Sequence, residues 1–150
     1  MLYFADYKYK DSSNFINKVI GRYFPYANNV LNEFRKNADF NVLQLPHYHF
    51  AFLKSEGCDY MGVIVYFNKA EIPTEDSERG VIFTSVLEIN YNYHGNEYGQ
   101  ELVEWLQEKF PGFKIRLCAK DEKIMNEYYL KRDFKIIDNE TRLLEYCGKF

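Results

Sequence analysis

The chain has 150 residues, 47% of them hydrophobic and 27% charged, and its formal net charge is −3. A chain of this length folds as one domain and buries a large core without help from metals or disulfides, so we expect a single domain over residues 1–150. The slight negative charge argues against nucleic acid as the main partner, because phosphate backbones are bound by concentrated basic faces.

The sequence indicates neither a membrane-spanning segment nor a metal site. No apolar run approaches the ~20 residues of a membrane-spanning helix, and the first ten residues lack the basic-then-apolar order of a signal peptide. We therefore expect a cytoplasmic protein without a membrane segment. Cys58, Cys118 and Cys147 form no Cys-x-x-Cys pair, which favours reduced thiols over a disulfide framework or a zinc site. His47 and His49 would share a strand face, but no third ligand accompanies them, so no metal site is expected.

The first third of the chain is predicted to form a strand and two helices. Residues 1–10 alternate loosely between apolar and polar side chains, as in a strand. Asp11, Ser12 and Ser13 offer N-cap chemistry for a helix, and the apolar residues after them recur at helical spacing until Pro25 breaks the pattern. A second helix is indicated by Ala27, Val30, Leu31 and Phe34, which share one side.

The middle and the end of the chain favour strands. Two strand-like runs, 47–54 and 60–68, flank a short polar loop with a glycine, which predicts a β-hairpin. Residues 69–79 are polar and acidic, as in an exposed loop, and residues 81–89 predict another strand. A closing pair of strands is expected over 134–137 and 142–146, around a turn.

The most informative stretch is residues 87–110, LEINYNYHGNEYGQELVEWLQEKF. A strand enters a turn that contains Gly95 and Gly99, and a helix is predicted over 96–110 because Leu102, Trp105, Leu106 and Phe110 recur at helical spacing. A helix N-terminus presents unpaired backbone N–H groups and the positive end of the helix dipole. The stretch therefore predicts an anion site, best suited to phosphate.

A second stretch continues this order of elements. Residues 114–119 alternate as in a strand, and Asp121 is placed to cap a helix that runs to about Arg132. Another strand begins at Phe134.

Together the two stretches, over residues 81–136, resemble the Gcn5-related N-acetyltransferase (GNAT) family. In that family a strand of pattern Leu-x-Val-x-Pro-x-Tyr-Arg-Gly-x-Gly-x-Gly enters a helix and holds the pyrophosphate of coenzyme A, and a later helix ends in Tyr-x-x-x-Gly-Phe. The matching residues are Leu87, Ile89, Tyr93, Gly95, Gly99, Tyr129 and Phe134. The chain departs from the family at five positions. His94 replaces Arg or Gln, Tyr91 replaces Pro, Glu97 and Asp133 each replace Gly, and Glu122 replaces Asn.

The resemblance implies an α+β (α/β) fold, with a mixed, mostly antiparallel central sheet flanked by about four helices, and acetyl-CoA as cosubstrate. It implies that the strand near Leu87 splays from its neighbour and that a backbone N–H near Ile89 faces the thioester oxygen. Tyr129 corresponds to the residue that protonates the leaving thiolate. The implied cofactor-binding residues are Leu87, Ile89, His94, Gly95, Asn96, Glu97, Tyr98, Gly99 and Gln100.

The function that the resemblance implies is the acetylation of a primary amine on a small molecule or peptide. The acceptor is not specified, and no general base is assigned: Glu88 should face away from Leu87 and Ile89, and a water relay or His49 stays open. Two other interpretations stay open as well. One is a binding module that keeps the fold without catalysis, marked by Glu97 and Asp133, and the other is an aromatic-rich α+β domain that recognises a protein or a sugar. The oligomeric state is also open, a homodimer included.

Overall fold

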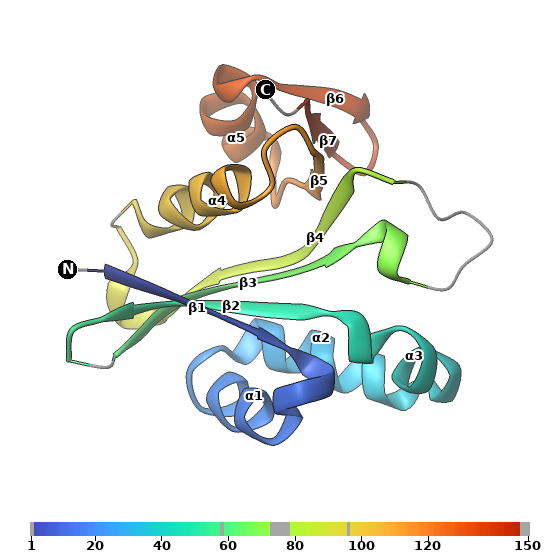
Figure 1. The fold of residues 1–150 in the computed structure, drawn as a ribbon. Helices are drawn as coiled ribbons and strands as arrows, with labels where there is room; N and C mark the ends of the chain where they lie inside the picture. Colours follow the sequence, from blue (N-terminus) through green and yellow to red (C-terminus); the bar gives the residue numbers. More distant parts are fainter. Residues whose placement is uncertain (1, 58, 73–78, 96, 148–150) are drawn as a thin grey trace.

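The computed structural model describes residues 2–57, 59–72, 79–95 and 97–147 (Figure 1). Its centre is a seven-stranded sheet in the order β1-β2-β3-β4-β5-β7-β6, in which only β4 and β5 run parallel. The expected mixed, mostly antiparallel sheet is confirmed. The strands are β1 (Leu2–Lys8), β2 (His49–Ser55), β3 (Tyr60–Asn68), β4 (Val81–Ile89), β5 (Lys114–Cys118), β6 (Phe134–Asp138) and β7 (Leu143–Tyr146).

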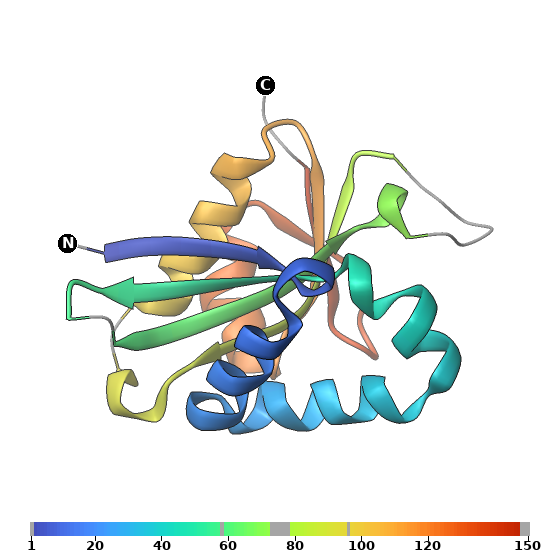
Figure 2. The same cartoon turned by 60° about the horizontal axis from the view of Figure 1, so that its bottom comes forward.

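Helices within the described residues cover both faces of the sheet (Figures 1 and 2). One face carries α1 (Tyr9–Tyr23), α2 (Pro25–Lys36) and α3 (Ala38–Leu43). The other face carries α4 (Tyr98–Lys109) and α5 (Glu122–Ile124), which continues into a π-helical turn over Met125–Tyr129 and a 3₁₀ turn over Leu130–Arg132. The sequence predicted four of these helices and missed α3, a six-residue helix whose N-cap, Asn37, accepts a hydrogen bond from the Phe40 N–H.

Two helix starts differ from the prediction. The first helix begins at Tyr9, and Ser12 interrupts it with non-helical dihedral angles of φ −139° and ψ 32°, so the predicted cap residues lie in a kink. The helix expected from residue 96 begins at Tyr98, after a 3₁₀ turn over Tyr91–Tyr93. Asn96 and residues 73–78 of the predicted acidic loop lie outside the described residues.

Apolar side chains pack on both faces of the sheet. One core joins α1 and α2 to the sheet through Ile16, Ile20, Phe24, Leu31, Phe50 and Phe52, and another joins α4 through Leu102, Leu106, Ile64 and Ile82. Gly62 of β3 permits the close approach of α4, because a Cβ there would lie 2.9 Å from Cδ1 of both Ile89 and Leu102. This contact sets the N-terminus of α4 beside the end of β4.

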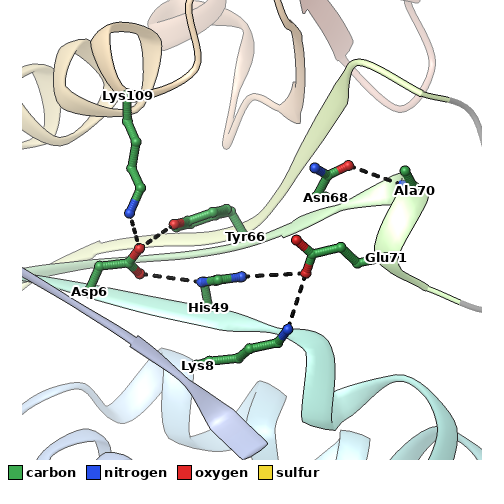
Figure 3. A network of polar contacts seen from close by, with 8 residues as sticks. All are labelled: Asp6, Lys8, His49, Tyr66, Asn68, Ala70, Glu71 and Lys109. Atoms are coloured by element: carbon green, nitrogen blue, oxygen red, sulfur yellow. Dashed lines mark hydrogen bonds and ion pairs between the residues drawn. The ribbon is translucent and has the colours of Figure 1, made fainter. Parts of the chain in front are cut away.

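A network of charged side chains ties the edge strand β1 to its neighbours (Figure 3). Asp6 accepts a hydrogen bond of 2.6 Å from the Tyr66 hydroxyl and forms an ion pair with Lys109 at the end of α4. His49 lies between two carboxylates, 3.6 Å from Asp6 and 3.7 Å from Glu71. Burial acts to raise the pKa of Asp6, but hydrogen bonds from His49, Lys109 and Tyr66 outweigh it and lower the pKa to about 2.

No helix in the described part of the chain combines the length and the apolar character needed to cross a membrane. No group of three or more His, Cys, Asp and Glu side chains there has an arrangement that could hold a metal ion.

Candidate functional site

The two parallel strands at the centre of the sheet separate after a short pairing. β4 pairs with β5 only from Val81 to Thr84, and residues 86–89 pair with β3 on one side and with no described strand on the other. A β-bulge at Ser85 accompanies the separation, since Thr84 pairs with Tyr66 and Val86 pairs with Val65. Bulges of this kind turn a strand and occur beside active sites.

A pocket of ≈ 820 Å³ occupies the gap between the separated strands. Of the predicted site residues, those that line the pocket are Leu87, Ile89, His94, Glu97, Gly99, Gln100 and Tyr129. Gly95 and Tyr98 belong to the same turn but do not line it, and Asn96 lies outside the described residues. His49, an open candidate for the base, lies instead in the network at the sheet edge. The structure thus brings both informative stretches of the sequence to one cavity.

The free edge of β4 offers backbone groups to this pocket. The N–H of Asn90 donates to the carbonyl of Met61 on β3 at 2.8 Å. Because backbone groups alternate sides along an antiparallel strand, the N–H and C=O of Ile89 point away from β3, toward the pocket. The N–H expected near Ile89 therefore has the orientation of an oxyanion donor.

The His94 side chain contacts the last residue of β4, Ile89, on this free edge. Its Nε2 lies 2.8 Å from the carbonyl oxygen of Ile89 and donates to it, since a carbonyl only accepts. In the neutral ring Nδ1 is then an acceptor. The resemblance counts His94 among the cofactor-binding residues, and in the structure its Nε2–H has a backbone partner, which no spacing rule reveals.

Two helix N-termini face the pocket, and they differ in their caps. At α2, the Glu88 carboxylate accepts hydrogen bonds from the N–H groups of Ala27 (2.7 Å) and Tyr26 (3.2 Å). At α4, the N-cap residue Glu97 makes no side-chain capping hydrogen bond, and Gly99 and Gln100 of the first turn line the pocket. The N-terminus of α4 is therefore the candidate anion site of this pocket.

Two adjacent tyrosines, Tyr128 and Tyr129, line another part of the pocket wall, and both lie in the π-helical turn over Met125–Tyr129. Tyr129 is 6% exposed, and burial raises its pKa to about 12, so the phenol stays protonated at neutral pH. The Tyr128 hydroxyl is buried without a hydrogen-bond partner among the described residues. Tyr128 was not predicted from the sequence, where its only signal is its place beside Tyr129.

Cationic side chains surround the same wall. The Arg132 guanidinium lies 4.1 Å from the centre of the Tyr128 ring, and its Nη2 lies 3.4 Å from Oε1 of Gln100 at the start of α4. Arg142 has a left-handed backbone (φ 56°), and its Nε and Nη2 donate to the carbonyls of Ala119 and Lys120 at 3.0 Å each. Arg142 thereby fixes the chain that leaves β5 and holds that side of the gap in place.

Comparisons with known proteins agree on the fold. No protein-family model matches the chain, and no curated protein does. Among solved structures, it is similar to an acetyltransferase of the GNAT family from Staphylococcus aureus, with 13% identity, 98% and 99% of the two chains covered and a TM-score of 0.54. It is also similar to the GNAT family N-acetyltransferase YhbS from Escherichia coli in complex with CoA, with 10% identity, 98% and 80% covered and a TM-score of 0.60.

A third similar structure is AtaTR bound with AcCoA, with 14% identity, 97% and 93% of the two chains covered and a TM-score of 0.59. These likenesses extend over nearly the whole chain, and the splayed β4 and β5 lie within them. The chain therefore has the fold of the GNAT acetyltransferases.

Proposed function

We propose that the protein is an acetyl-CoA-dependent N-acetyltransferase that acts on a primary amine. The observation that carries the proposal is the pocket between β4 and β5, which combines a free strand edge, the uncapped N-terminus of α4 and a buried, protonated tyrosine. Two of the similar structures were solved with CoA or AcCoA bound. Together these features support a cofactor that has a phosphate end, an extended amide arm and a thioester.

The residues of the pocket fit such a cofactor. The first-turn N–H groups of α4 would hold the pyrophosphate, and Arg132 places a positive charge beside Gln100. The Glu97 carboxylate would repel the pyrophosphate, but it is exposed at the first turn of α4, where the helix dipole favours a carboxylate. The free edge of β4 would pair with the amide arm.

Acetyl-CoA supplies the acetyl group and a thiolate leaving group. The Ile89 N–H points into the pocket, where it would donate a hydrogen bond to the thioester oxygen and stabilise the charge that develops there. The Tyr129 phenol, whose pKa burial raises to about 12, holds its proton at neutral pH and would give it to the departing sulfur, and the proton that the amine loses on forming the amide would restore the phenol. Tyr129 lines the same pocket as Leu87 and Ile89, as this division of roles needs.

One of the two substitutions that favour a decayed, non-catalytic module is compatible with an intact site. Asp133, which replaces a family glycine, adopts φ 67° and ψ 18° at the end of the 3₁₀ turn. Aspartate is among the few residues that tolerate this left-handed conformation. The substitution therefore preserves the backbone path that a glycine would take, and only Glu97 still favours decay.

Ligand binding and turnover test the proposal. A ligand that binds only the folded state adds RT ln(1 + [L]/Kd) to stability, about 2.7 kcal/mol at a hundredfold excess over Kd. Acetyl-CoA and CoA should therefore each raise the melting temperature by several degrees, and thiol should be released in the presence of a panel of amines. Unchanged melting with both ligands would remove the cofactor, and binding without thiol release would favour the decayed module.

A further inference from the structure

The pocket has two faces with different chemistry. Val86 of β4 packs in the core with α1 and α2, whereas Leu87 and Ile89 pack in the core with α4. Since side chains alternate along a strand, Glu88 lies on the α2 face, which its hydrogen bonds to the start of α2 confirm. The α4 face carries the proposed phosphate site, so the α2 face is the one left for a second substrate.

Glu88 is a fixed, partly buried carboxylate on that face. Its two oxygens accept the N–H groups of Ala27 and Tyr26 at the N-terminus of a 12-residue helix, where a negative charge is favoured. An ionised carboxylate has about four lone-pair sites, and these two bonds use only part of them. Glu88 also lines the pocket next to Leu87 and Ile89, whose strand edge would hold the thioester.

The other charged groups of the pocket lie elsewhere. Glu97 belongs to the α4 face, at the N-terminus of that helix. Lys120 and Arg142 line the wall that continues from β5, and the Arg142 guanidinium is turned toward the carbonyls of Ala119 and Lys120. His94 is bonded to Ile89 at the strand end. Among the described lining residues, Glu88 is therefore the one carboxylate on the α2 face.

We propose that Glu88 binds the ammonium group of the acceptor and restricts the acceptor to aliphatic, cationic amines. The inference rests on the proposed function, because it needs the α2 face to be the acceptor side. Tyr26, 59% exposed at the start of α2, borders the same opening and offers a ring edge and face to the carbon chain of the amine. An alcohol or a neutral aromatic amine of the same size gains no charge pairing with Glu88.

The test uses n-pentylamine and 1-pentanol as matched probes of the full-length protein, with and without saturating CoA. Ligand-observed NMR titration gives both dissociation constants. The wild type is expected to bind pentylamine roughly ten- to a hundredfold more tightly than pentanol, the range of a hydrogen bond to a charged group. Glu88→Gln should abolish the difference and leave pentanol binding unchanged. Glu33→Gln removes a carboxylate from the exposed surface of α2, the helix that Glu88 caps, and should keep the preference.

Equal binding of the two probes by the wild type, or a full preference in a folded Glu88→Gln variant, overturns the proposal. If Glu88→Gln does not fold, the carboxyl ¹³C resonance of Glu88 in the wild type decides instead. It should shift with pentylamine and not with pentanol, and the absence of a shift overturns the proposal. If the wild type does not bind CoA, the proposed function is refuted. If it binds CoA but does not prefer pentylamine over pentanol, only the role of Glu88 is refuted.

Discussion

The Nε2 atom of His94 lies 2.8 Å from the carbonyl oxygen of Ile89, so the imidazole occupies the last backbone acceptor on the free edge of β4. The contact links the turn before α4 to the strand that would hold the thioester. It fixes the ring tautomer, since Nε2 must carry the hydrogen.

Replacing His94 should therefore weaken cofactor binding by loosening this edge. His94→Leu removes one hydrogen bond to a backbone carbonyl, typically worth about 1 kcal/mol, so the Kd of acetyl-CoA should rise roughly fivefold. Isothermal titration calorimetry measures the change. His47→Leu serves as control, because His47 does not line the pocket. An unchanged Kd in His94→Leu would show that the imidazole does not organise the edge.

The two pocket tyrosines should behave differently when each loses its hydroxyl. Tyr129→Phe should lower kcat by roughly 10²–10⁴-fold with little change in acetyl-CoA binding, the usual effect of removing a positioned general acid. Tyr128→Phe removes a buried hydroxyl without a partner in the described protein, so it should keep stability or gain slightly. Steady-state thiol release and thermal melting distinguish the pair. Wild-type turnover in Tyr129→Phe would assign the acid elsewhere.

Neutralising Glu97 should strengthen cofactor binding. Its carboxylate lies at the N-cap of α4, beside the proposed phosphates, and Glu97→Gln removes the repulsion. A pair of exposed charges interacts by about 0.2–1 kcal/mol, so the Kd of CoA should fall by up to roughly fivefold at low salt. The gain should shrink at high salt, because ions screen exposed charges. Glu108→Gln, near the other end of α4, should change nothing, and a weaker Kd in Glu97→Gln would mean that Glu97 assists binding.

Asp6 should make stability depend on pH in the acid range. Its pKa is lowered from 3.8 to about 2, so the folded state favours the ionised form. The stabilisation, roughly 2 kcal/mol, is present above the unfolded pKa and is lost as the pH falls through about 4 toward 2. Urea unfolding at a series of pH values measures it. Between pH 4 and 2 the free energy of unfolding should change less with pH in Asp6→Asn than in a Glu140→Gln control. An equal pH dependence in the two variants would contradict the lowered pKa of Asp6.

Much of the fold could be predicted because local patterns agree with the final structure. The strand expected over residues 81–89 is β4. Asp121 caps α5, as predicted, by accepting a hydrogen bond of 2.8 Å from the Ile124 N–H. The kink at Ser12 and the π-helical turn at Met125–Tyr129 were not predictable, since the packing of distant elements sets them. The likeness of the fold to GNAT acetyltransferases, first inferred from two motifs, is confirmed by the structure comparisons.

The site was only partly predictable for the same reason. The sequence correctly placed Glu88 on the face opposite Leu87 and Ile89. Its two hydrogen-bond partners lie 61 and 62 residues away, at a helix start whose path across the sheet no local pattern encodes. The roles of the pocket residues remain predictions, to be decided by the binding and turnover measurements.

The ion pair of Asp6 and Lys109 also bears on how the chain folds as it is synthesised. The two residues are 103 positions apart. β1 can pair with β2 once Ser55 has emerged, yet the Asp6 carboxylate waits for its ammonium partner until α4 is complete, a delay of roughly 3 to 10 seconds at ribosomal rates. During that interval the Asp6 carboxylate has its partners on β2 and β3, His49 and Tyr66, but not the Lys109 ammonium, so the N-terminal edge of the nascent sheet is held less firmly. Ribosome-bound chains that stop before Lys109 should therefore be cut by protease near β1, and chains that extend past it should resist.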